Sequence, residues 1–277
     1  MRNVGTVVRG IRTPIIKTND NLAEIVVDSL MKASNSDGFT FKDKDIVAIT
    51  EAVVGISEGN YVTVDNIAED LINKFPSKEI GLVYPILSRN RFSMILKGIA
   101  RGMNKITILL SFPSDEVGNG IMDEEKLDNS AFDLGSIITE KEYYQNFGDF
   151  RHPFTGINMV DYYRELCEKE NCQVEFVFSN KVADILKYTN NVLNCDIHTR
   201  VKTKKLLTSK GATCYSLSDV LNEPINNSGC NPKYGLLGSN KATEEKLKLF
   251  PAKGDILIKD IQTKLKELTG KNIEVMV

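Results

Sequence analysis

Polar and charged side chains follow four of the strands that the sequence predicts in the middle of the chain. They are Arg89 and Arg91 after residues 81–87, Asp115 and Glu116 after residues 105–111, Asn180 after residues 173–178, and Asp196, His198 and Arg200 at the end of residues 192–197. In an open parallel sheet, ligands bind outside the carboxyl ends of the strands, where the strand order reverses. We therefore expect these side chains to gather at one edge of one sheet.

An anion is the ligand that these residue types favour. The guanidinium groups of Arg89, Arg91 and Arg200 present planar forks that match phosphate and carboxylate. Predicted helices that begin near Ser88, Asn180 and Thr199 would add backbone N–H donors. The alternative interpretation is that Ser88 and Thr199 are ordinary helix caps and that each arginine is a surface charge.

Proton transfer and metal binding are two further possibilities at this edge. Histidine is the side chain best suited to carry a proton in enzyme sites, and His198 lies beside Asp196 and Arg200 in the sequence, so these three residues are the candidate catalytic group. The oxygens of Asp115 and Glu116 are ligands that suit a divalent cation. In the alternative interpretation, both carboxylates lie in a solvated surface loop.

The elements that position these residues alternate along the middle of the chain. Apolar strands are predicted over residues 81–87, 105–111, 173–178, 192–197 and 212–217, and helices over 90–101, 140–147, 159–169, 181–188 and 199–209. Short apolar strands separated by helices indicate a doubly wound parallel sheet, covered by helices on both faces. The fold class is therefore α/β.

The two ends of the chain have a different pattern. Strands are predicted over residues 4–8, 45–50 and 273–277, the second of them buried, and helices over 22–33, capped by Asn19 or Asp20, over 63–75 and over 256–268. These patterns divide the chain into segments 1–78, 79–222 and 223–277. A chain that ends on an apolar strand indicates either that this strand closes a sheet or that the natural protein continues.

Composition excludes several classes of function. The chain has 277 residues and a net charge of −2, so no basic field indicates nucleic-acid binding. No apolar run has the length of a membrane span, and the first residues do not form a signal peptide. Five cysteines without a CxxC pair indicate reduced thiols in the cytoplasm and argue against zinc. Neither a P-loop nor a GxGxxG dinucleotide motif is present.

Short motifs at both ends resemble the coenzyme F-420 gamma-glutamyl ligases. The residues that carry the likeness are Gly10 to Lys17 followed by Asp20, the segment Glu58-Gly59-Asn60, the segment Gly235 to Asn240, and the helix, turn and strand over residues 265–277. About 110 residues are covered, and the middle of the chain does not match.

This resemblance implies a ligase that uses GTP and Mn²⁺ or Mg²⁺ to form a gamma-glutamyl amide through an acyl phosphate. Its substrates would be glutamate and an anionic acceptor, either a deazaflavin or a folate-like pterin, and the protein would act as a homodimer. The terminal segments would pack together, with the middle as an insertion. The likeness assigns nucleotide binding to Gly10, Arg12, Pro14, Glu58, Ser239 and Asn240, in addition to Arg89, Arg91 and Asn180.

Departures from the family pattern leave catalysis open. Gly55 and Ile56 occupy the family's serine and lysine positions, and Leu237 occupies the position of a metal-binding aspartate. Either Asp115, Glu116 or Asp196 replaces the lost ligands, or the chain is catalytically incomplete. In the second case it is a small-anion or nucleotide-binding module, or a fragment of a larger ligase.

Overall fold

The computed structural model describes residues 5–277, which form two compact units. The terminal unit comprises residues 5–60 and 250–277, and the central unit comprises residues 61–249. Residues 61–78 and 223–249 thus belong with the middle of the chain, whereas the sequence pattern grouped them with the two ends. The reason is burial, because Ile67 and Leu71 from the first stretch and Leu247 from the second lie in the central core.

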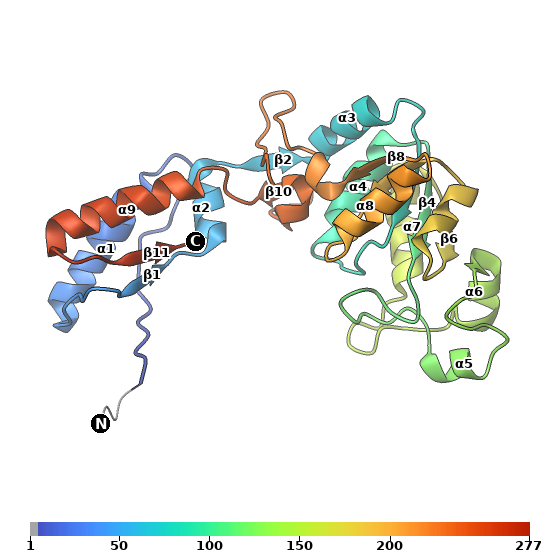
Figure 1. Cartoon of the computed structure of the whole chain (residues 1–277), viewed down its shortest axis with the longest axis horizontal. Coiled ribbons are helices and arrows are strands. Elements are labelled where there is room, and N and C mark those ends of the chain that lie inside the picture. Colours follow the sequence, from blue (N-terminus) through green and yellow to red (C-terminus); the bar gives the residue numbers. More distant parts are fainter. Residues whose placement is uncertain (1–4) are drawn as a thin grey trace. The chain divides into compact units, whose positions relative to one another are not determined.

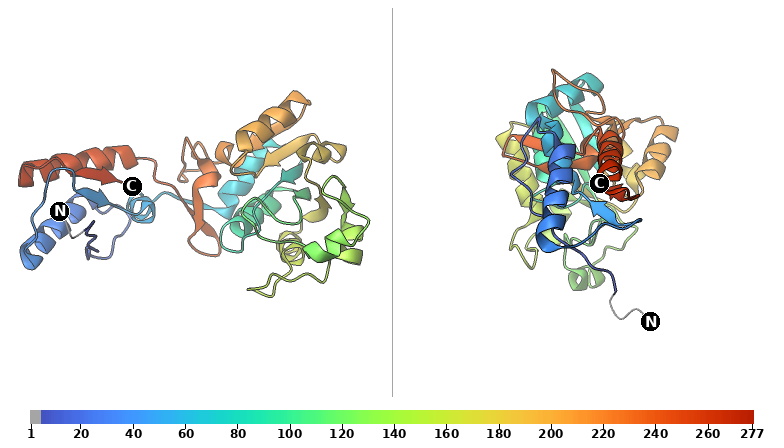
Figure 2. Two further views of the ribbon diagram at one scale, coloured as in Figure 1. Left: turned by 60° about the horizontal axis from the view of Figure 1, so that its bottom comes forward. Right: turned by 90° about the vertical axis from the view of Figure 1, so that its left-hand side faces the viewer.

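The terminal unit is built from both ends of the chain. Its elements are α1 (Leu22–Asp37), β1 (Ile46–Ala48), α2 (Glu51–Glu58), α9 (Gly254–Thr269) and β11 (Glu274–Met276). Strands β1 and β11 pair in parallel, and the two long helices pack together over a shared apolar core. Both views in Figure 2 show the red C-terminal helix beside blue N-terminal elements. The predicted packing of the two ends against each other is confirmed.

Three predictions in the terminal unit are wrong. Strand β1 is not buried, since Ile46 is 67% exposed. The physical reason is that β1 belongs to a two-stranded sheet, and only its Val47 side packs against the core. The strand predicted over residues 4–8 is also absent over residues 5–8, and Val4 lies outside the described residues. The cap of α1 is neither Asn19 nor Asp20, as predicted, but Asn21, whose side chain accepts the N–H of Glu24.

The central unit contains a six-stranded sheet (Figure 1). Its strands are β3 (Glu79–Val83), β4 (Lys105–Leu110), β5 (Ile138–Thr139), β6 (Gln173–Phe178), β7 (Asn191–Asn194) and β8 (Thr213–Ser216). Their order is β5-β6-β4-β3-β7-β8, and every pairing is parallel except that of the edge strand β5. The predicted doubly wound parallel sheet is confirmed.

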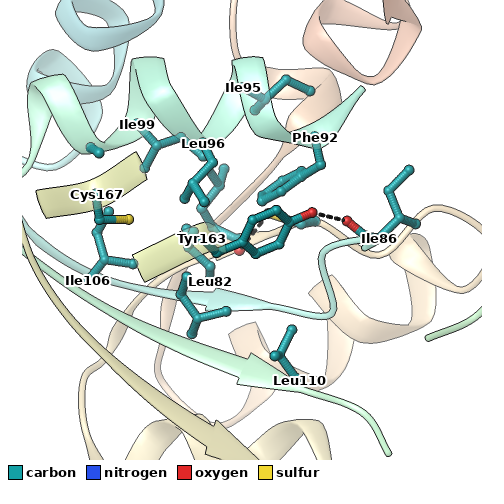
Figure 3. Close-up of a cluster of buried hydrophobic side chains, with 14 of the residues drawn as sticks. Leu82, Ile86, Phe92, Ile95, Leu96, Ile99, Ile106, Leu110, Tyr163 and Cys167 are labelled. Atoms are coloured by element: carbon teal, nitrogen blue, oxygen red, sulfur yellow. Dashed lines mark hydrogen bonds between the residues drawn. The ribbon is translucent and has the colours of Figure 1, made fainter. Parts of the chain in front are cut away.

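Helices cover both faces of this sheet because successive strand residues point to opposite sides. The helices are α3 (Val64–Lys74), α4 (Phe92–Gly102), α7 (Met159–Lys169) and α8 (Arg200–Ser209), with a 3-10 helix η1 (Val182–Lys187) where a full helix was predicted. Leu82 faces the core beneath α4 and α7 (Figure 3), and Ile108 belongs to the same buried cluster. Their neighbours Val83 and Leu109 face a second cluster formed with η1 and α8.

The helix predicted over residues 140–147 is present as α6 (Glu140–Asn146). Several other short elements of the central unit were not predicted from the sequence. They are α5 (Glu124–Asp128), η2 (Leu217–Asp219), η3 (Gly235–Gly238) and a three-stranded sheet of β2 (Tyr61–Thr63), β10 (Lys246–Leu249) and β9 (Ser239–Lys241). Within residues 5–277, no helix has the length and apolar character needed to cross a membrane.

Candidate functional site

The strand order reverses between β3 and β7. Counted along the chain, the parallel strands lie in the order third, second, first, fourth, fifth, so the first and fourth strands are neighbours. Ligands of open α/β sheets bind outside the carboxyl ends of the strands at such a switch point. The candidate site is therefore formed by the loops that follow β3 and β7, together with the adjoining loop after β4. We call it the switch-point edge.

Tyr84 ties the end of β3 to its neighbours. Its backbone φ of +52° lies in the left-handed region, which residues other than glycine adopt only when their surroundings hold them there. The Tyr84 N–H donates to the Leu109 carbonyl at 3.0 Å, and its phenol donates to the Ser179 carbonyl at 3.1 Å. Burial raises the pKa of Tyr84, so the phenol keeps its proton. The ends of β3, β4 and β6 are thus fastened together.

Tyr163, on α7, holds the loop that carries Arg89 and Arg91. Its phenol donates to the Ile86 carbonyl at 2.6 Å and accepts the N–H of Ser88 at 2.9 Å (Figure 3). The side chain is completely buried, and this burial raises the pKa of the phenol. Because one hydroxyl satisfies a buried donor and a buried acceptor, the start of this loop has a defined position.

Asp115 is a structural link at this edge. One carboxylate oxygen accepts the N–H groups of Val117 and Asn119, at 3.0 and 2.8 Å. The other accepts the N–H of Leu87 and the side-chain amide of Asn119, both at 2.8 Å. A carboxylate offers about four lone-pair positions. All of them are used here, so Asp115 does not fit the predicted role of a metal ligand.

Glu116 extends the same loop to the far side of the switch point. Its carboxylate accepts the N–H of Ile197 at 2.8 Å and the N–H of His198 at 3.0 Å, and lies 2.8 Å from His198 Nδ1. Strand β3 separates β4 from β7 in the sheet. The loop after β4 therefore crosses the carboxyl end of β3, with Asp115 attached on the β3 side and Glu116 on the β7 side.

The predicted catalytic group does not form a proton relay. Asp196 is buried and accepts the Thr199 N–H at 2.8 Å and the Thr203 hydroxyl at 2.6 Å, so it positions the first turn of α8. His198 is exposed and pairs with Glu116, not with Asp196. The guanidinium of Arg200 donates to the Ile197 carbonyl within its own loop.

Arg89 and Arg91 are the available cations of the switch-point edge. Both are exposed, and their guanidinium groups make no ion pair with any residue that the structure describes. The side chain of Asn180 has a structural role, because it accepts the N–H of Phe112 at 3.1 Å and donates to the carbonyl of Phe112 at 2.8 Å. The structure thus places all of the predicted residues of the central sheet at one edge, but leaves few of them free for a ligand.

A divalent metal is not accommodated by the residues predicted to bind it. The carboxylate oxygens of Asp115 and Glu116 already accept hydrogen bonds from backbone N–H groups. Within residues 5–277, no group of three or more histidine, cysteine or acidic side chains has the geometry of a metal site. We therefore assign no metal to these two residues.

The remaining predicted nucleotide-binding residues are divided between the two units. Gly10, Arg12 and Pro14 lie in an exposed irregular segment of the terminal unit. Glu58 accepts the N–H groups of Ala252 and Lys253, just before α9. Ser239 and Asn240 lie in β9 of the central unit, where the Ser239 hydroxyl donates to the Leu236 carbonyl at 2.7 Å.

The profile of the F420-0:Gamma-glutamyl ligase family matches residues 10–277. The match covers nearly all of the chain, including the central unit that the terminal motifs had left unassigned. The chain belongs to this family. Neither the curated proteins nor the solved structures contain a match.

Two of the positions at which this chain departs from the family motifs carry apolar side chains that are partly buried in the structure. Ile56 lies on α2 and is half-buried, and Leu237 packs against the central core. Gly235, by contrast, matches the family motif, and the backbone at this position requires a glycine. Its φ is +46°, and a Cβ at this position would lie 2.3 Å from the Val220 carbonyl oxygen. The motif from Gly235 to Asn240 is thus preserved where backbone geometry requires it and altered at the expected metal ligand.

Tyr84 and Tyr163 were both missed by the sequence analysis. Tyr84 carried a signal, because it directly precedes a proline inside the strand predicted over residues 81–87, and a proline inside a predicted strand indicates that the strand ends there. Tyr163 carried none, since a tyrosine on an amphipathic helix is most often simply core. Only the fold reveals that its hydroxyl reaches the loop after β3.

Proposed function

We propose that this protein joins L-glutamate to an anionic acceptor through a gamma-glutamyl amide, with GTP as phosphoryl donor and Mn²⁺ or Mg²⁺ as counterion. The acceptor carboxylate would first become an acyl phosphate, and the glutamate amine would then displace phosphate. The observation that carries this proposal is the family match over residues 10–277. The acceptor is a deazaflavin or a folate-like pterin, and the enzyme works as a cytoplasmic homodimer.

The switch-point edge supplies the anion-binding part of the proposal. Arg89 and Arg91 lie at its rim without ionic partners among the described residues, and bidentate guanidinium contacts suit a phosphate or a carboxylate. No step is assigned to Asp115 or Glu116 acting through a metal, because their oxygens are already occupied.

A ligase assay tests this function. The protein is incubated with GTP, MnCl₂, L-glutamate and either F420-0 or a monoglutamyl folate, and the acceptor is analysed by mass spectrometry. The expected result is an acceptor heavier by one glutamyl residue, with equimolar phosphate release that stops when a chelator is added. Size-exclusion chromatography with light scattering tests the dimer.

A second candidate is a nucleotide-binding module without turnover. It is favoured by Ile56 and Leu237 at the positions of the family's lysine and aspartate. In this case GTP binds, but neither phosphate nor a glutamylated acceptor appears. The two candidates are therefore separated by the same assay combined with a binding measurement.

A further inference from the structure

A basic groove lies on the central unit between α8 and the end of β8. It has a volume of about 600 Å³, and the residues that define its chemistry are Arg200, Lys204, Lys205, Thr208, Ser216 and Ser218. Among residues 5–277, no acidic side chain lines it. The volume falls within the range of small-molecule pockets, which is roughly 300–1,000 Å³. We call it the α8 groove.

The charge around the α8 groove is concentrated in one stretch of sequence. Residues 197–218 contain five lysine and arginine residues and no aspartate or glutamate, although the whole chain has a net charge of −2. Lys204 is neutralised by Asp219 at 2.6 Å, but Lys205 and Arg200 form no ion pair with any residue in the described part of the chain. Two cations are therefore available to a ligand.

The floor of the groove offers a hydroxyl proton. Ser216 is buried, and its Oγ accepts hydrogen bonds from the Asn194 side chain and from the backbone N–H of Asp219. Because this oxygen already accepts twice, its own proton is left to donate, and no acceptor for it occurs within residues 5–277. This proton can therefore be donated to a ligand in the groove without breaking either of the bonds that Ser216 Oγ accepts.

We propose that the α8 groove binds a small molecule through a carboxylate or phosphate group. Arg200 and Lys205 supply charge, and the Ser216 hydroxyl supplies a directed hydrogen bond from the floor. The stems of these side chains and Val201 add an apolar wall. The site is formed by α8 and β8, whereas Arg89 and Arg91 belong to the loop after β3.

Binding titrations followed by NMR test this site with two probes. Inorganic pyrophosphate represents phosphate ligands, and the dipeptide γ-glutamylglutamate represents carboxylate ligands. Lys205→Glu reverses a charge within the groove, and Lys202→Glu makes the same change on the same helix outside it. We expect at least one probe to bind with shifts at residues 216–218, and Lys205→Glu to weaken it about tenfold or more. Lys202→Glu should change affinity by less than about threefold.

The result names the ligand class, because the probe that binds more tightly identifies it. Ser216→Ala provides a second check and should weaken binding while leaving the pattern of shifted residues unchanged. The proposal is overturned if neither probe shifts residues 216–218. It is also overturned if both lysine variants weaken binding equally, because the interaction would then be a general attraction to a basic surface.

Discussion

The carboxylate of Glu116 reaches across the end of β3 and lies 2.8 Å from Nδ1 of His198, in the loop after β7. The same carboxylate accepts two backbone N–H groups of that loop. The loops after the second strand (β4) and the fourth strand (β7) are thus linked across the carboxyl end of the first strand (β3). Residues that the sequence analysis selected for chemistry therefore shape the edge at which a ligand would bind.

Removal of this link should loosen the loop after β7. Glu116→Ala leaves the N–H groups of Ile197 and His198 without their acceptor, and we expect their hydrogen exchange to accelerate by about tenfold. NMR-detected exchange measures the effect, and Glu223→Ala, an exposed change in the same unit, serves as the control. Unchanged protection at both residues would show that the Glu116 bonds are unimportant in solution.

Substitution of Asp115 distinguishes a structural role of its carboxylate from a role as a metal ligand. Because Asp115→Ala deprives several N–H groups of a buried acceptor, it should lower the free energy of unfolding of the central unit by about 2–4 kcal/mol. Urea denaturation with and without MnCl₂ measures this. A metal-ligand role predicts the reverse pattern, with little loss in metal-free buffer and a loss of manganese-dependent stabilisation.

Substitution of Tyr163 tests whether the hydroxyl of this core residue holds the loop after β3 at the switch-point edge. Tyr163→Phe keeps the ring but leaves the Ile86 carbonyl and the Ser88 N–H unpaired, so we expect a loss of about 1–3 kcal/mol of stability. Tyr162→Phe is the matched control, since the hydroxyl of this neighbour makes no hydrogen bond within the described residues. Equal stability of the two variants in urea denaturation would contradict the assigned role.

Substitution of Gly235 tests why the segment from Gly235 to Asn240 begins with a glycine. Gly235→Ala combines a positive φ with a Cβ only 2.3 Å from a backbone oxygen, and should cost at least about 2 kcal/mol. Gly118→Ala has φ +85° but open space around the new methyl group, so it should cost only about 1 kcal/mol. Thermal unfolding compares them, and a smaller loss for Gly235→Ala would be incompatible with the crowded backbone.

Acid should weaken the start of α6. Hydrogen bonds from the hydroxyl and the N–H of Thr139 lower the pKa of Glu142 below its ordinary value of 4.5. Since the folded-state pKa is depressed, the contribution is complete above the unfolded pKa and is lost as the pH falls through the folded value. Glu142→Gln should remove this pH dependence of amide exchange in α6. An identical acid response in both proteins would count against the capping box.

Most of the central fold could be predicted from sequence because its elements are periodic and apolar. The helix over 159–169 and the strand over 173–178 have the predicted bounds. The elements that failed were those stabilised mainly by tertiary contacts. Strands β2, β9 and β10 have three or four residues each, too few to show a period. The burial of β1 was mispredicted because an apolar strand does not reveal how many neighbours its sheet contains.

The edge that carries the candidate site was also predictable, whereas the role of each residue was not. A parallel sheet follows from alternating strands and helices, and the carboxyl ends of parallel strands share one edge, so the residues after each strand could be grouped in advance. Whether a carboxylate faces a ligand or a backbone N–H depends on loop geometry, which sequence pattern does not encode. Asp115 and Asp196 were therefore assigned to chemistry although both hold loops in place.

The most direct measurement is an equilibrium titration of GTP with MnCl₂ against the wild-type protein, Arg91→Ala and Lys105→Ala. Arg91 lies at the switch-point edge, and Lys105 begins β4 at the opposite edge of the same sheet. We predict that the wild type binds GTP, that Arg91→Ala weakens binding about tenfold, and that Lys105→Ala binds like the wild type. Absence of binding to the wild type, or equal affinity of all three proteins, would contradict nucleotide recognition at this edge.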